Sequence, residues 1–253
     1  MSAKELVNRV AIVTGAGRGI GRSVALTLAS EGATVIANDI REDWCVSVAD
    51  EITNVGGRAL AYLADVADWS AVKRMVESSI DVYGAVDILV NNAGVLRPTT
   101  PLEQIPEEEW DLVMSVNVKG AFNCIKAVLP IMKKQRRGRI VNVSSIAGRS
   151  VSHAGGAHYT ASKAALLGLT RHAALEGAEY GIHVNAIAPG DVDTEMMAAF
   201  CTPERLAILA SSIPFGRMAT AEEIAQLVLF LTSDRCSYIT GATIHIDGGS
   251  LMI

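Results

Sequence analysis

Short runs of apolar and β-branched residues alternate with longer amphipathic segments along most of this 253-residue chain. Short apolar runs bounded by turn residues are typical of buried strands, and the amphipathic segments have the spacing of helices. The expected strands are residues 9–14, 34–37, 59–63, 88–90, 139–143, 183–187 and 243–246. The expected helices are residues 20–30, 44–55, 70–82, 107–134, 159–179 and 221–232. Because a helix between two strands serves as the crossover that joins parallel neighbours, we predict one Rossmann-like, doubly wound α/β domain over residues 1–253, with a seven-stranded, mainly parallel sheet flanked by helices.

The composition of the chain argues against several classes of binding partner. Hydrophobic residues make up 50% of the chain and charged residues 19%, with a net charge of -5. Interspersed, mildly negative charge predicts neither a nucleic-acid face nor a polybasic membrane tract. We identify no export signal and no stretch of about 18 uninterrupted apolar residues. The four cysteines form no CxxC pair, which fits a reducing compartment and argues against a metal site. We therefore expect a cytoplasmic protein that binds no metal, nucleic acid or membrane.

Tyr159 and Lys163 lie four residues apart, and Ser145 precedes Tyr159 by fourteen residues. On a helix this spacing puts the phenol and the ammonium on one face, where the cation favours the phenolate and lowers the pKa of the phenol from about 10. Such a phenol can transfer protons at neutral pH, while the serine can hold a substrate oxygen. The same Tyr/Lys spacing also arises by chance in many helices, so the other motifs decide its meaning.

A glycine-rich turn, Gly15-Ala16-Gly17-Arg18-Gly19-Ile20-Gly21, follows the first expected strand. Its spacing is Gly-x-x-x-Gly-x-Gly. Glycines allow a tight turn and close backbone approach, and the following helix offers unpaired N–H groups to a pyrophosphate. We therefore predict a dinucleotide phosphate site at this turn.

Asp39 ends the second expected strand. A carboxylate at this place accepts hydrogen bonds from the adenosine ribose and repels a 2′-phosphate, so we expect NAD, with NADP the less favoured cofactor. Two observations leave alternatives open. Arg18 and Arg41 each offer a cation to a 2′-phosphate, and a strand-end aspartate also serves as a helix cap.

Several further motifs occur in order along the chain: Asn91-Asn92-Ala93-Gly94 after the fourth expected strand, Ser145-Ile146-Ala147-Gly148, and Pro189-Gly190. Together with the glycine turn and the Tyr159-x-x-x-Lys163 pair, they cover nearly the whole chain, which resembles the short-chain dehydrogenase/reductase family. The resemblance implies that Tyr159 is the general acid/base for hydride exchange between a nicotinamide and a carbonyl or alcohol carbon. It also implies that Lys163 lowers the pKa of Tyr159 and binds the nicotinamide ribose, that Ser145 rather than Ser144 bonds the substrate oxygen, and that Asn117 anchors a water on the proton path. The spacing from Ser145 to Tyr159 is one residue longer than the commonest family form.

The resemblance also implies further cofactor contacts. Asp65 and Val66 would meet the adenine, and Asn92, Ala93 and Gly94 would line the adenosine side. Pro189, Gly190, Val192 and Thr194 would pack on the nicotinamide and bond its carboxamide. Asn91 is expected to brace two strands instead.

The substrate side is less determined. Residues 190–220 hold several methionines, prolines and phenylalanines after a strand end, so we expect a substrate-binding loop or lid there. Substrate contacts are expected from Ser145, His153, Tyr159, Asp191 and Met196. The alternative for residues 190–220 is a surface helical hairpin. The alternative for Asp191 is that its side chain faces solvent beside the cofactor.

We expect an enzyme that interconverts a secondary alcohol and a ketone with NAD, acting on a small-molecule substrate. The first alternative is a 3-oxoacyl-acyl-carrier-protein reductase, a branch that usually takes NADPH; Asp39 opposes that cofactor, and Tyr180 replaces an arginine common in that branch, although Arg136 is present. The other alternative is a dinucleotide-binding scaffold or redox sensor without catalysis. Members of the family are commonly tetramers, so a homotetramer is expected.

Overall fold

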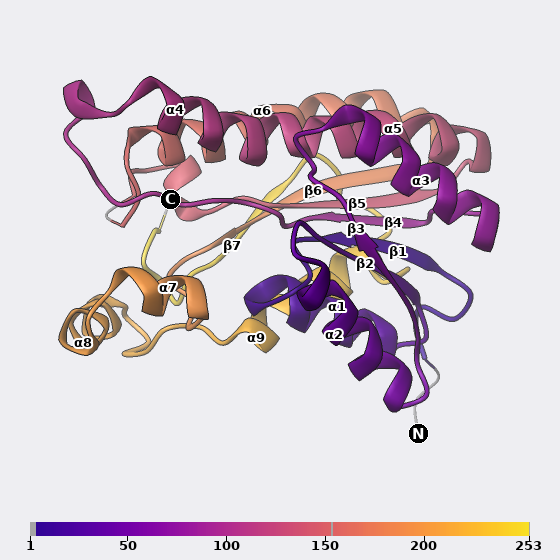
Figure 1. The fold of residues 1–253 in the computed structure, drawn as a ribbon, viewed down its shortest axis with the longest axis horizontal. Coiled ribbons are helices and arrows are strands. Elements are labelled where there is room, and N and C mark those ends of the chain that lie inside the picture. The colour runs from indigo at the N-terminus through magenta and orange to yellow at the C-terminus, as the bar shows by residue number, and fades with distance from the viewer. Residues whose placement is uncertain (1–3, 153, 253) are drawn as a thin grey trace.

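The sheet is the predicted one. The computed structural model describes residues 4–152 and 154–252, and in these residues seven parallel strands form one sheet in the order β3-β2-β1-β4-β5-β6-β7 (Figure 1). The strands are β1 Val10–Thr14, β2 Thr34–Asp39, β3 Arg58–Leu63, β4 Ile88–Asn91, β5 Gly138–Val143, β6 Ile182–Pro189 and β7 Thr243–Ile246. Each expected strand is present, with bounds shifted by a few residues at most.

Helices cover both faces of the sheet (Figure 1). One face carries α3 Trp69–Tyr83, α4 Glu107–Met114, α5 Ala121–Gln135 and α6 Ala157–Gly177. The other carries α1 Gly19–Ser30, α2 Glu42–Asn54 and α9 Ala221–Thr232. Two short helices, α7 Glu195–Phe200 and α8 Pro203–Ser212, follow β6 and stand away from the sheet (Figure 1). They lie within the segment predicted as a lid.

Two apolar cores result, one on each face. Successive residues of β1 enter opposite cores, because strand side chains alternate in direction. Ile12 packs in the core beneath α3 and α5 with Met75, whereas Val13 packs in the core beneath α1 and α9 with Leu28. All four side chains are fully buried. This double burial explains why the strands are continuous apolar runs.

The long helix expected over residues 107–134 is interrupted. A π-helical segment, Ser115–Gly120, separates α4 from α5. Periodicity alone does not distinguish an i→i+5 turn from the i→i+4 turns around it, so the sequence gives no local signal for this segment. Its position matters, because it holds Asn117.

One helical run among the described residues, Glu107–Gln135, is long and apolar enough to cross a membrane by length and composition alone. Core helices of globular proteins pass the same test. Here Val128 and Met132 of this run are fully buried against the sheet, in the core shared with α3.

The carboxyl ends of the strands meet at one edge of the sheet. The chain runs from β1 outward through β2 to β3, then returns to place β4 on the other side of β1. Such a reversal opens a crevice beyond the carboxyl ends of the strands, where doubly wound folds bind ligands. Thr14 of β1 and Asn92, the residue after β4, flank this point, and their contacts shape the site.

Candidate active site

The glycine turn is held by an asparagine from the next strand. The side-chain amide of Asn92 donates to the carbonyls of Thr14 at 3.0 Å and Gly15 at 2.9 Å. Gly15 adopts a φ of +62°, which favours glycine, and a Cβ on Gly21 would collide with the carbonyl oxygen of Gly15. No side chain at Arg18 caps α1. The first N–H groups of α1 are therefore presented to the crevice, as an anion site requires.

Asp39 is fixed by two backbone amides. Its Oδ2 accepts from the Gly17 N–H at 3.1 Å and its Oδ1 from the Arg41 N–H at 3.1 Å, and the residue is 7% exposed. The alternative role as cap of α2 is absent, since the N-cap is Arg41, without a side-chain cap bond. Asp39 lines the crevice, as the ribose-binding role requires.

Two residues of this region, Gly17 and Trp44, were not among the predicted cofactor contacts. A Cβ on Gly17 would lie 2.5 Å from Cβ of Trp44 and 2.8 Å from Oδ2 of Asp39, so only glycine allows these groups to close around the turn. Trp44 lines the crevice, and the guanidinium carbons of Arg18 and Arg41 lie 4.5 and 4.8 Å from its ring centroid. The extra glycine inside the motif was the available signal, but its meaning depends on where Trp44 lies in space.

The adenine side is built from the end of β3. Asp65 Oδ1 accepts from the Ala67 N–H at 2.8 Å, which fixes the turn. Val66 is 5% exposed, and its carbonyl accepts from the Asn123 amide at 2.9 Å. Asn91 donates to Asn142 at 2.8 Å between β4 and β5, which confirms its expected bracing role.

One continuous cleft brings the predicted cofactor residues together. Its outer part is lined by Gly15, Arg18, Gly19, Ile20, Asp39, Asp65, Val66, Asn92, Ala93 and Gly94. Its inner part is lined by Tyr159, Lys163, Pro189, Gly190, Val192 and Thr194. The two parts share Ile20, Asn92, Gly94, Val95, Thr194 and Met196. Of the predicted set only Gly21 does not line the cleft, because it is buried against Gly15.

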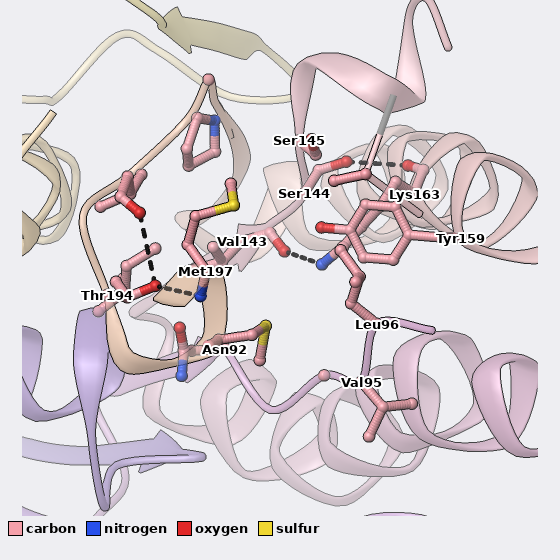
Figure 2. A pocket seen from close by; sticks show the side chains of 17 residues that line it. Asn92, Val95, Leu96, Val143, Ser144, Ser145, Tyr159, Lys163, Thr194 and Met197 are labelled. Carbon is pink, nitrogen blue, oxygen red and sulfur yellow. Dashed lines mark hydrogen bonds between the residues drawn. The ribbon is translucent and has the colours of Figure 1, made fainter. Parts of the chain in front are cut away.

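Tyr159, Lys163 and Ser145 meet in the inner part of the cleft (Figure 2). Tyr159 and Lys163 come from α6, and Lys163 Nζ lies 5.5 Å from the Tyr159 ring centroid. Nζ donates to the Val143 carbonyl at 2.9 Å, and Lys163 is only 6% exposed. The Ser144 hydroxyl is buried and donates to the Lys163 carbonyl at 2.9 Å, whereas Ser145 bonds Tyr159. The Ser144 hydroxyl is therefore engaged by the main chain of α6, whereas the Ser145 hydroxyl is bonded to the phenol of Tyr159 in the cleft.

Burial dominates the ionisation of this pair. It raises the pKa of Tyr159 to about 12; the hydrogen bond with Ser145 opposes the rise, and the negative charge of Asp191 adds to it. Burial also lowers the pKa of Lys163 to about 8. The lowered pKa expected for Tyr159 is therefore not found in the protein's own groups, because desolvation of the phenolate is the largest cause of its shift. Tyr159 is a neutral phenol at neutral pH.

Asn117 fastens the π-helical segment to the site. Its Oδ1 accepts from the Val95 N–H at 2.8 Å, and its Nδ2 donates to the Val95 carbonyl and the Ser162 hydroxyl, both at 3.0 Å. The residue is 2% exposed. Both side-chain hydrogens are thus bonded within the protein, which leaves the main chain of the π-helical segment as the group able to hold the expected water.

The substrate side is split between two adjoining hollows. Met196 lines the nicotinamide cleft, whereas Asp191 lines a second hollow shared with Ser145 and bordered by Arg205 of α8. His153 lies outside the described residues. His158, the residue before Tyr159, is fully buried: its ring contacts Glu109 Oε1 at 2.9 Å and accepts the Tyr159 N–H at 2.7 Å, so it supports α6.

No cluster of three or more metal-ligating side chains occurs among the described residues.

Comparison with known proteins agrees with this geometry. Residues 15–250 match the family model described as enoyl-(acyl carrier protein) reductase. The chain is 45% identical over 244 residues to the 3-oxoacyl-acyl-carrier-protein reductase FabG of Thermotoga maritima, covering 96% of this chain and 98% of that one. It is 40% identical over 245 residues to the enzyme of that name from Escherichia coli, covering 97% and 98%.

Solved structures give the same result. The 3-oxoacyl-acyl-carrier-protein reductase of Brucella melitensis aligns with a TM-score of 0.92 at 37% identity, covering 99% of this chain and 94% of that one. Levodione reductase aligns with a TM-score of 0.92 at 33% identity, covering 96% and 98%. The chain therefore belongs to the short-chain dehydrogenase/reductase family, oxidoreductases that use a nicotinamide dinucleotide and act on CH–OH and ketone groups.

Proposed function

We propose that the protein reduces the 3-oxo group of acyl thioesters carried on an acyl-carrier protein. The observation that carries this proposal is the geometry of the inner cleft, where the phenol of Tyr159 bonds Ser145 and Lys163 Nζ lies 5.5 Å from the Tyr159 ring centroid. A protonated phenol is ready to donate to a carbonyl oxygen, which is what reduction needs. The 3-oxoacyl reductases that match over nearly the full chain at 40 to 45% identity support this substrate class.

In this mechanism the bound nicotinamide supplies the hydride to the carbonyl carbon. Ser145 and Tyr159 bond the carbonyl oxygen, and Tyr159 gives its proton to that oxygen as negative charge develops there. Lys163 stays protonated at neutral pH, because its pKa of about 8 lies above it, and stabilises the phenolate that forms. A proton from solvent would restore the phenol by way of Lys163 and a water held by the main chain of the π-helical segment.

We also propose NADH as the preferred reductant. Asp39 supports this choice, since its carboxylate is held in place at the crevice by Gly17 and Arg41. A 2′-phosphate would meet that fixed negative charge. The preference departs from the NADPH usual in the 3-oxoacyl reductase branch.

A second candidate is reduction of a small cyclic or secondary ketone, the first expectation from the sequence. The likeness to levodione reductase and the carboxylate of Asp191 beside Ser145 favour it. The two candidates differ in the length of substrate that the hollow beneath Arg205 receives.

Kinetics with a panel of substrates separates the candidates. Acetoacetyl-CoA and a set of small ketones are supplied with NADH or NADPH, and loss of reduced cofactor is followed by absorbance. We expect kcat/KM for the thioester to exceed that for the small ketones by at least about 100-fold. Faster turnover of the small ketones would replace the proposal by the second candidate.

The Tyr159→Phe variant addresses the scaffold alternative. It keeps the ring and removes the proton, so kcat should fall by about 10²- to 10⁴-fold while NADH binding is retained. Undiminished turnover in this variant would exclude the catalytic role of Tyr159.

We further propose that residues 1–253 act as one catalytic domain, that residues 190–220 cover the substrate, and that the enzyme is a cytoplasmic homotetramer. The apolar side chains of Trp110, Leu112 and Phe122 on α4 and α5 are 38, 38 and 46% exposed, which supports burial in an assembly. Light scattering at micromolar concentration tests the assembly, and a monomer there would refute it.

A further inference from the structure

The adenosine end of the cleft holds an unusual arrangement of charges around Trp44. We propose that Asp43 tunes the choice between NAD and NADP by holding Arg41, which would otherwise bind a 2′-phosphate. This inference rests on the proposed placement of the nucleotide between Gly15 and Asp39. Asp43 is thus a positioning residue that acts through Arg41.

Arg41 is engaged by Asp43 through two bonds. Its Nε donates to Asp43 Oδ1 at 3.1 Å and its Nη2 to Asp43 Oδ2 at 2.8 Å, so one fork of the guanidinium is filled. The same pairing raises the pKa of Arg41 and lowers that of Asp43, hydrogen bonding being the largest cause of each shift. A fork of this geometry is the one that a phosphate uses, so the carboxylate and a 2′-phosphate compete for it.

Trp44 keeps both cations beside Asp39. The guanidinium groups of Arg18 and Arg41 both lie over its ring, at 4.5 and 4.8 Å from the centroid. The ring is itself packed against Gly17, whose N–H bonds Asp39. Arg41 therefore lies next to the corner formed by Asp39 and Trp44, and its guanidinium is bonded to Asp43.

The local charge balance then disfavours a phosphate. Residues 39–43 carry three carboxylates, those of Asp39, Glu42 and Asp43, and the single guanidinium of Arg41. Arg18 adds a second cation over Trp44, and Asp65 adds a further carboxylate to the crevice. A 2′-phosphate brings about two more negative charges to this corner. Removing the Asp43 charge would lower the negative charge of the corner by one and free the Arg41 fork, whereas removing the Glu42 charge would lower it equally without touching the fork.

Isothermal titration calorimetry of Asp43→Asn with NADPH and NADH tests the proposal, and Glu42→Gln is the matched control. We expect Asp43→Asn to tighten NADPH binding by about five- to tenfold, with NADH within about twofold of wild type. Glu42→Gln should stay within about twofold for both nucleotides. The gain should shrink as salt rises. Equal effects of the two variants, or no gain with Asp43→Asn, would overturn the role of Asp43.

A second variant separates the mechanism from a general loss of structure. Arg41→Ala should barely change NADPH binding in the wild-type background but should abolish the gain in the Asp43→Asn background. A gain that persists without Arg41 would also overturn the proposal. Nucleotide binding is measured without substrate, so a failure of the proposed 3-oxoacyl reduction would leave this result interpretable.

Discussion

Burial of the Lys163 ammonium in the cleft lowers the free energy of unfolding of the protein, and this effect can be measured. Its pKa is lowered by burial from 10.5 to about 8, and the residue is 6% exposed. The folded state therefore binds fewer protons than the unfolded state between about pH 8 and 10.5, so stability rises with pH across that window. Below about pH 8 the penalty is fully present. It amounts to roughly 3 kcal/mol, at about 1.4 kcal/mol for each pH unit of difference.

The Lys163→Met variant removes the charge and keeps most of the volume. The free energy of unfolding of wild type, relative to this variant, should increase by about 2 kcal/mol between pH 7 and pH 9.5. Urea denaturation followed by circular dichroism at several pH values measures it. Turnover should be lost in the same variant, because the phenolate loses its ammonium.

Lys73→Met on α3 is the control, since Lys73 is an exposed lysine paired with Glu77. It should follow wild type across the same pH range. A constant stability difference between wild type and Lys163→Met would refute the reasoning, because it would mean that the ammonium is as well solvated in the folded state as in the unfolded state.

Two further substitutions test the supports of the site. Asn117→Ala removes three hydrogen bonds of a buried side chain and should lower the free energy of unfolding by about 3 kcal/mol in urea. Asn185→Ala, whose buried side chain bonds Ile239 and Ala242 outside the cleft, should lower stability while sparing kcat. A loss below about 1 kcal/mol for Asn117→Ala would contradict the bonding described. Gly17→Ala places a Cβ 2.5 Å from Trp44 Cβ and should weaken NADH binding by at least about tenfold in calorimetry. Gly168→Ala, whose new Cβ meets only Arg171 at 3.9 Å, should bind normally; equal binding by both variants would refute the packing role of Gly17.

Much of the site was predictable because its signals are local. The glycine turn, the Asp39 strand end and the Tyr159/Lys163 spacing each depend on a few consecutive residues, and the structure brings them into one cleft. Other features depend on contacts between distant segments. Ser144 and Ser145 are neighbours of the same type; the family resemblance favoured Ser145, and the bond from Ser144 to the Lys163 carbonyl gives the physical reason why Ser144 is engaged elsewhere.

The sequence by itself determined the alternation of strands and crossover helices, and hence the parallel sheet with a phosphate turn after its first strand, because periodicity and turn chemistry are properties of short segments. The tertiary structure alone decided the ionisation of Tyr159 and Lys163, the π-helical segment at Asn117 and the closure of Trp44 over Gly17. Desolvation and close packing arise only when segments far apart in the chain exclude water together, and no pattern along the sequence encodes how much water remains.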